Sequence, residues 1–302
     1  MAAFGDRAPE VRPDGPSAAG AGVWDRALPW RLATAVVAIP LLVWLTLRGG
    51  PAFLGLIFVI IGLGLWEFYA LMSAQGLRPY RWLGLGTGLV VPWFVYTGLP
   101  THANFFLTAF LIGTTALELL RPRDHGVAPM SVTFFGLLYV AWLASHLLYL
   151  RELPTRLDLP YGDGAHFVFL ALLPTWACDT AAYAVGLLLG RRRLHPSVSP
   201  KKSVEGSIAG LVAATALTVA LARLWVPGLP LALALVLGLG IGVFAQVGDL
   251  VESLLKRTSR AKDSATWIPG HGGVLDRFDS LFFTAPLVYY FLVLAVFPDR
   301  VP

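Results

Sequence analysis

Long apolar stretches separated by short polar segments run along almost the whole chain. The hydrocarbon core of a bilayer is about 30 Å thick, so a membrane-spanning helix needs roughly 20 mostly apolar residues. Nine stretches approach this length and predict an all-α, polytopic integral membrane protein with nine transmembrane helices. The predicted spans are residues 32–47, 52–72, 82–99, 105–120, 132–150, 167–190, 208–225, 230–247 and 281–297.

The basic residues fall unevenly on the two sides of such a nine-helix arrangement. Eighteen of the 23 Lys and Arg residues lie in the N-terminal tail and in the loops on the same side of the membrane as that tail. The remaining five lie in the segments on the opposite side. Lys and Arg accumulate in the short cytoplasmic loops of membrane proteins. The pattern therefore predicts a protein of the cytoplasmic (inner) membrane, with its N-terminus in the cytoplasm and its C-terminus outside.

The composition points to lipid rather than water as the solvent. Of the 302 residues, 56% are hydrophobic and 14% are charged, and the mean hydropathy is +0.68. An ordinary soluble domain has about 25% charged residues, so a water-soluble globule is excluded. The single cysteine, Cys178, excludes a disulfide framework and a cysteine-rich metal site.

The same pattern divides the chain into three parts. Residues 1–24 mix Pro, Gly, Ala and charged residues without periodicity and predict a disordered cytoplasmic tail. Residues 25–165 form an N-terminal transmembrane region, and residues 166–302 form a C-terminal catalytic region. The two largest cytoplasmic loops, 191–207 and 248–280, belong to the C-terminal region and are the places expected to carry chemistry.

Three acidic residues, Glu67, Glu118 and Asp179, lie within or at the ends of apolar spans. Placing an ionised carboxylate in lipid costs about 2.5–3.5 kcal/mol, so each should face protein, water or an ion. Glu67 and Glu118 lie toward the cytoplasmic ends of their helices, where they either reach the interface or pair with a basic side chain. Asp179, in the stretch TWACDTAAY, indicates either a polar cavity or a hydrogen bond between helices.

The segment GDLVESLLKRTSRAKD, which follows the eighth span, has the periodicity of an amphipathic helix. Its polar residues fall on one helical face, and Leu and Val residues take the other. A helix lying on the membrane surface is the ordinary explanation of such a pattern. The mixture of carboxylates and amines on one face favours a binding site instead. That face holds Asp249, Glu252, Ser253, Lys256, Arg260 and Asp263.

The next run, IPGHGGVLDRFDS, combines glycines with groups that bind phosphate. Gly272 and Gly273 let the backbone approach an anion closely, and His271 and Arg277 can donate to phosphate oxygens. A glycine-rich loop alone is a weak signal. Here Asp276 and Asp279 follow directly, with i, i+3 spacing on one face of the start of the ninth helix.

Carboxylates without a cluster of His or Cys residues indicate a hard cation. Asp249 and Asp276 flank one predicted cytoplasmic loop, each beside the end of a helix. Mg²⁺ takes oxygen ligands and completes its shell with water and substrate phosphates. The segment SPKKSVEG adds Ser199, Lys201 and Lys202 on the same side of the membrane. This combination suggests a polyphosphate substrate.

The two segments resemble those of the phosphatidate cytidylyltransferases, also called CDP-diacylglycerol synthases. SPKKSVEG is similar to the family motif S-P-K-K-T-x-E-G, with Ser203 in place of the threonine. The resemblance at the level of motifs covers about residues 175–300 and is only architectural over the first half. The C-terminal signature of the family is matched by Ser253, Lys256, Arg257, Lys262, Asp263, His271, Gly272, Gly273, Asp276, Arg277 and Asp279.

The resemblance implies that phosphatidic acid and CTP react, with magnesium required, to give CDP-diacylglycerol and pyrophosphate. It places the metal-binding aspartates at Asp249 and Asp276, and Asp279 is a third candidate. Catalysis is assigned to Asp249, Asp276, Lys201, Lys202, Lys256, His271 and Arg277. Substrate binding is assigned to Ser199, Lys201, Lys202, Glu205, Ser253, Lys256, Arg257, Lys262, Asp263, Gly272, Gly273 and Asp179.

The expected partners are CTP, phosphatidic acid and membrane lipid, and no nucleic acid. A second cation such as K⁺ and a homodimer are left open. A CTP-dependent polyprenol or phytol kinase is the alternative enzyme, which would release CDP instead of pyrophosphate. A membrane transporter is the alternative of a different class, because intramembrane acids and Gly- or Pro-interrupted helices also mark ion pathways. It would leave the His-Gly-Gly and Lys-Lys segments unexplained.

Overall fold

A computed structural model gives the fold and describes residues 20–120, 126–259, 272–298 and residue 300. The first helix begins at Gly20 and so extends into the segment predicted as a tail. Residues 1–19 of that segment lie outside the described residues. Four of the residues singled out above also lie outside them, namely Arg260, Lys262, Asp263 and His271.

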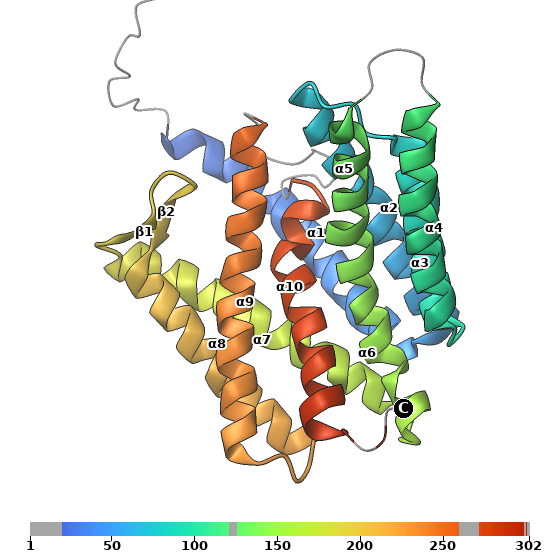
Figure 1. The fold of residues 1–302 in the computed structure, drawn as a ribbon. Helices are drawn as coiled ribbons and strands as arrows, with labels where there is room; N and C mark the ends of the chain where they lie inside the picture. Colours follow the sequence, from blue (N-terminus) through green and yellow to red (C-terminus); the bar gives the residue numbers. More distant parts are fainter. Residues whose placement is uncertain (1–19, 121–125, 260–271, 299, 301–302) are drawn as a thin grey trace, which may run out of the picture.

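The described residues form long helices and one short hairpin (Figure 1). The N-terminal half contains α1 (Gly20–Arg48), α2 (Gly50–Ala74), α3 (Arg81–Tyr96), α4 (Pro100–Leu119), α5 (Val127–Gly136), a π-helical segment (Leu137–Trp142) and α6 (Leu143–Leu157). The C-terminal half contains α7 (Asp163–Leu189), β1 (Arg193–His195), β2 (Ser199–Ser203), α8 (Val204–Trp225), α9 (Leu231–Thr258), α10 (Leu275–Phe291) and a second π-helical segment (Leu292–Val296).

These helices confirm an all-α, polytopic membrane protein. Lipid offers no partner to backbone polar groups, so apolar segments of this length satisfy them within a helix. Each of the nine predicted spans overlaps a described helical segment. The number of nine crossings stays a prediction, because six described segments are both long and apolar enough to cross a membrane. They are Gly50–Ala74, Val127–Leu157, Asp163–Leu189, Val204–Trp225, Leu231–Thr258 and Leu275–Val296.

The described parts of the two predicted loops, 191–207 and 248–280, lie at one end of the molecule. Figure 1 shows the β1–β2 hairpin at the same end as the last turns of α9 and the start of α10. Strands β1 and β2 are antiparallel, with Arg193 opposite Ser203. The side chain of Arg257, in the last turn of α9, donates from Nε to the carbonyl oxygen of Val198, 3.2 Å away in the hairpin. This contact ties the hairpin to α9.

A buried arginine satisfies the last carbonyl groups of α1 at the opposite end. The side chain of Arg151 in α6 is 1% exposed. Its Nε donates to the carbonyl oxygen of Thr46 at 2.8 Å, and its Nη2 donates to that of Leu47 at 3.2 Å. The final carbonyls of a helix have no partner within the helix and carry partial negative charge. The guanidinium therefore meets both needs and fixes α1 against α6.

Helices α9 and α10 pack closely against each other at Gly248. A Cβ atom at this position would lie 2.7 Å from the backbone oxygen of Asp279 and 2.9 Å from the Cα of Ser280. Separations this short force a shift of the backbone, so the crossing requires glycine. The contact brings the next residue of α9, Asp249, alongside Asp279 of α10.

Replacing Gly248 by Ala is expected to lower the melting temperature, because overpacking that moves the backbone costs about 1–3 kcal/mol. The matched control is Gly62→Ala in α2, where a Cβ would meet nothing within 4 Å. Alanine favours a helix over glycine by about 1 kcal/mol, so this control should melt at an unchanged or higher temperature. Thermal melting of the detergent-solubilised protein checks both variants, and equal melting temperatures would contradict the close packing.

Candidate active site

Three acidic side chains meet between α9 and α10. One carboxylate oxygen from each of Asp249, Glu252 and Asp279 lies within 4.8 Å of the others. Glu252 is 1% exposed and Asp279 is 9% exposed. Two ionised carboxylates at that separation repel each other by about 3 kcal/mol at an effective dielectric constant near 20. This acidic cluster, Asp249–Glu252–Asp279, therefore needs positive charge beside it.

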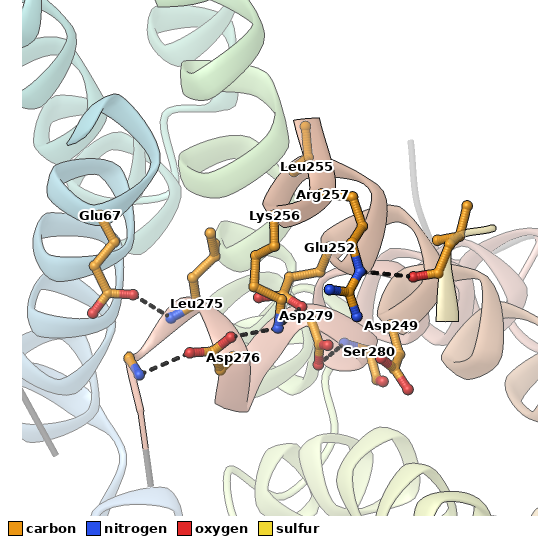
Figure 2. A network of polar contacts seen from close by, with 12 residues as sticks. Glu67, Asp249, Glu252, Leu255, Lys256, Arg257, Leu275, Asp276, Asp279 and Ser280 are labelled. Atoms are coloured by element: carbon orange, nitrogen blue, oxygen red, sulfur yellow. Dashed lines mark hydrogen bonds and ion pairs between the residues drawn. The ribbon is translucent and has the colours of Figure 1, made fainter. Parts of the chain in front are cut away.

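Two lysines supply part of that charge. The ammonium group of Lys256 lies 2.6 Å from Oε2 of Glu252 and 2.8 Å from Oδ1 of Asp276 (Figure 2). Lys202, at the end of β2, forms an ion pair with Asp249. Asp276 and the three acids of the cluster thus share two ammonium groups, which leaves an excess of negative charge when all four acids are ionised. A divalent cation would offset this excess.

The available donor atoms also suit a hard divalent cation. Carboxylate oxygens are the ligands that Mg²⁺ prefers in proteins. The Oε1 atom of Glu252 is buried and receives no hydrogen bond from the residues that the structure describes. In contrast, Oδ1 of Asp279 accepts a hydrogen bond from the backbone N–H of Ser280 at 2.6 Å. A buried acceptor without a donor is costly, and a cation at the cluster would satisfy it.

Asp276, which the resemblance assigns to the metal, has other partners in the structure. Its Oδ1 accepts a hydrogen bond from Lys256 at 2.8 Å, and its Oδ2 accepts one from the backbone N–H of Gly273 at 2.9 Å. Lys256 bridges Asp276 and Glu252, so it would share these carboxylates with an ion at the acidic cluster. Asp276 as a metal ligand stays a prediction. The same holds for Asp249 and Asp279, whose carboxylates the structure brings together.

The two described glycines of the His-Gly-Gly segment shape the start of α10. Gly272 has a φ of +80°, a left-handed conformation that glycine adopts far more readily than other residues. This turn aims the N–H of Gly273 at Asp276. Arg277 follows in the first turn of α10 and is exposed. Contacts of these groups with a phosphate stay a prediction.

A cavity of about 660 Å³ opens beside the acidic cluster. It lies between α7, α8, α9 and the hairpin, and its polar wall includes Lys201, Lys202 and Asp249. Its apolar wall includes Tyr183 and Leu187, which are 66% and 71% exposed on the outer surface of α7. Asp249 belongs to both the cavity wall and the acidic cluster, so an ion at the cluster would be reached directly from the cavity.

The other predicted residues of α7 and α8 have distinct places. Asp179 lines the cavity. This position agrees with a polar cavity, the first of the two explanations given above for this intramembrane acid. Glu205 accepts hydrogen bonds from the backbone N–H groups of Arg191 and Arg192, at 3.1 and 3.2 Å. It therefore supports the polypeptide turn before β1. Its predicted contact with substrate stays a prediction.

Two predicted substrate-binding serines belong to the hairpin and to α9. Ser199 begins β2 and pairs with His195 of β1. Ser253 lies in α9 and is partly exposed. Ser203, the residue that departs from the family motif, keeps a structural function, because its Oγ accepts a hydrogen bond from the N–H of Gly206 at 3.2 Å. This bond caps the N-terminus of α8.

Two buried polar residues near the acidic cluster lie outside the motifs. Glu67 of α2 accepts hydrogen bonds from the backbone N–H groups of Val274, the residue before α10, and Leu275, its first residue. Figure 2 shows the bond from Leu275. Tyr139 lies in the first π-helical segment, a conformation that is frequent at functional sites. Its ring packs against Phe282 and Phe283 of α10, and its hydroxyl has no hydrogen-bond partner among the described residues. In the sequence, Glu67 stands out because it is an acidic residue within an apolar span. Tyr139 does not stand out, because the sequence gives nothing that distinguishes it from other aromatic residues of the core.

Comparison with known proteins identifies the family. A family model described as "Cytidylyltransferase family" matches residues 29–295. Two similar proteins, from Synechocystis sp. and Bacillus subtilis, are both named phosphatidate cytidylyltransferase. The Synechocystis protein is 38% identical over 287 residues, which cover 87% of this chain and 96% of the relative. The B. subtilis protein is 32% identical over 278 residues, which cover 87% of this chain and 97% of the relative. The chain belongs to the cytidylyltransferase family.

The acidic cluster is expected to bind a divalent ion without any nucleotide present. Asp249→Asn and Asp279→Asn should each weaken the binding of Mn²⁺, used as a paramagnetic probe, by at least about tenfold, because even residues that only support metal ligands contribute 10- to 100-fold. The matched control is Asp158→Asn, at an exposed position with a φ of 58° that Asn also tolerates. Electron paramagnetic resonance titration measures the affinities, and equal values for all three variants would exclude the site.

Proposed function

We propose that this chain is a phosphatidate cytidylyltransferase, which transfers CMP from CTP to phosphatidic acid and produces CDP-diacylglycerol and pyrophosphate. Two observations support this activity. The chain belongs to the cytidylyltransferase family, and the two relatives named phosphatidate cytidylyltransferase align with it over nearly their whole length. Residues 166–302 are proposed to hold the catalytic groups. The homodimer left open by the sequence stays a prediction.

The position of Asp249 is the single observation that carries the proposal. Its carboxylate is part of the acidic cluster and also lines the cavity beside Lys201 and Lys202. Ligands for a divalent ion and cations for phosphate are thus adjacent at one opening. Two negatively charged substrates can meet only where both kinds of group are available, and the arrangement fits this requirement.

The proposed reaction needs charge neutralisation more than it needs a base. The second pKa of a phosphomonoester is about 6, so the phosphate of phosphatidic acid is ionised at pH 7. One of its oxygens attacks the α-phosphorus of CTP and forms the new P–O bond. The bond from the α-phosphorus to the bridging oxygen of the β-phosphate breaks, and pyrophosphate leaves with that electron pair. The enzyme's contribution is to position two anions in line.

We assign the described residues to this task by their placement. Lys201 and Lys202 would hold the triphosphate in the cavity, and Arg277 would bind a phosphate from the start of α10. Lys256 holds Glu252 and Asp276 in place. Ser199 and His271 are proposed to orient phosphates, and His271 lies outside the described residues.

The proposed metal ligands are Asp249 and Asp279, with Glu252 and Asp276 beside them. Mg²⁺ bound there would neutralise the triphosphate and polarise its α-phosphorus. Asp276 is the less direct candidate because it is not one of the three acids that converge within 4.8 Å, and Lys256 and Gly273 already bind its two oxygens.

The lipid substrate and the nucleotide are proposed to reach the cavity from different directions. Tyr183 and Leu187 would accept the diglyceride portion, since both are exposed on the surface of α7. CTP is a cytoplasmic metabolite, so the end with the hairpin would face the cytoplasm. That orientation agrees with the distribution of Lys and Arg, which favours a cytoplasmic N-terminus, an external C-terminus and the inner membrane.

Incubation of the purified protein with phosphatidic acid, Mg²⁺ and CTP labelled in its α-phosphate tests the reaction. Label is expected in the lipid extract, with one pyrophosphate released for each labelled lipid. A polyprenol kinase would instead transfer the γ-phosphate and release CDP. A transporter would cleave no CTP, so either of these results would overturn the proposal.

Asp249→Asn should lower kcat by at least about 100-fold, because it removes a proposed ligand and the effect of supporting residues alone reaches that size. Asp158→Asn, the control defined above, should keep kcat within about twofold, as expected of surface substitutions. Initial rates at saturating Mg²⁺ and CTP provide the comparison. Near-normal turnover of Asp249→Asn would remove this residue from the reaction.

A further inference from the structure

Glu67 makes a contact that joins the two halves of the chain at the candidate active site. It lies in α2 and is 1% exposed. Its Oε1 accepts a hydrogen bond from the backbone N–H of Val274 at 2.9 Å, and its Oε2 accepts one from that of Leu275 at 2.8 Å. Figure 2 shows the carboxylate directed at the start of α10. The residues that it joins are more than 200 positions apart in the sequence.

These two bonds cap a helix that lacks a side-chain cap at its own N-terminal residue. The first N–H groups of any helix have no partner within the helix, and Val274, at the N-cap position of α10, provides none from its side chain. A carboxylate at a helix N-terminus also interacts favourably with the helix dipole. Glu67 therefore satisfies two donors that would otherwise be buried without an acceptor, since Val274 and Leu275 are 6% and 0% exposed.

The capped first turn of α10 holds Asp276, which is linked to the acidic cluster through Lys256. Asp276 is the residue immediately after Leu275, and its carboxylate binds Gly273 and Lys256. Lys256 in turn binds Glu252. Asp279 lies one turn further along α10. A rotation or displacement at the start of α10 would therefore alter the spacing of the acids that belong to α9 and α10.

We propose that Glu67 is a positioning residue for the divalent-ion site. It fixes the first turn of α10 so that Asp279 faces Asp249 and Glu252 at the spacing a metal ion requires. This inference rests on the proposed function for the identity of the ion, and it extends that function to a residue of α2 that touches neither substrate nor ion. A carboxamide cannot replace Glu67 fully, because only its oxygen can accept a hydrogen bond.

Glu118 offers a matched control for the structural part of this contact. It is also a buried carboxylate, 6% exposed, and it also accepts from a backbone N–H that precedes a helix. Its Oε1 binds the N–H of Gly126, before α5, at 2.9 Å, and its Oε2 accepts the hydroxyl of Tyr80. Glu118→Gln therefore removes a comparable contact from the N-terminal half.

The test compares Glu67→Gln, Glu67→Asp and Glu118→Gln in the full-length protein. We expect Glu67→Gln to raise the dissociation constant of Mn²⁺ about tenfold without nucleotide present, in the range typical of residues that orient metal ligands. The Mg²⁺ concentration for half-maximal activity should rise in parallel, while the KM for CTP at saturating Mg²⁺ stays within about twofold. Glu67→Asp, which keeps both acceptor oxygens, should restore part of the affinity.

Thermal melting separates a positioning effect from general destabilisation. Glu67→Gln and Glu118→Gln should both lower the melting temperature, but only the former should change Mn²⁺ affinity. An unchanged Mn²⁺ affinity in Glu67→Gln, or an equal loss in Glu118→Gln, would overturn the inference. If Glu67→Gln does not fold, the Mn²⁺ affinity of Glu67→Asp decides between these outcomes. Failure of the wild-type protein to form CDP-diacylglycerol would refute the proposed function and leave this comparison of ion affinities intact.

Discussion

Negative charge gathered at one end of an apolar helix bundle determines which segments must pack together there. Asp249, Glu252 and Asp279 approach within 4.8 Å, where their mutual repulsion would separate α9 from α10 unless cations held them together. Lys202 and Lys256 provide the protein's own cations, and each comes from a different segment. The hairpin, α9 and α10 are therefore joined by the charges that the candidate reaction uses.

The N-terminal half contributes to the site although both cytoplasmic-loop motifs lie in the C-terminal half. Helix α2 is the most apolar of the candidate spans after α9, and it places Glu67 where the first turn of α10 needs an acceptor. The π-helical segment before α6 places Tyr139 against the same helix. The candidate site is thus formed by α9, α10 and the hairpin, and contacts from α2 and the π-helical segment help to maintain its geometry.

The sequence predicted the parts of this structure that follow from local patterns. Apolar length located the helices, and the 3.6-residue period placed Asp249, Glu252 and Lys256 on one face of α9, where they do meet. It did not predict the β1–β2 hairpin, whose strands are too short and too polar to show alternation. Nor did it predict the bond from Glu67 to Val274, because no periodic pattern relates residues that distant. Glu252 was placed on the polar face without a function, and its burial against Asp279 emerges only when α9 and α10 pack at Gly248.

The ion pair between Lys202 and Asp249 has a consequence for the order of events at the cavity. While the lysine serves as counter-ion to the aspartate, each group offsets the charge of the other and so weakens its attraction for an incoming ligand. If Asp249 held a divalent ion, that ion would offset the charge of the aspartate, and the ammonium group of Lys202 would then be free to bind a triphosphate in the same cavity. Because each ligand removes the electrostatic obstacle to the other, occupancy by metal and by nucleotide should rise together rather than independently.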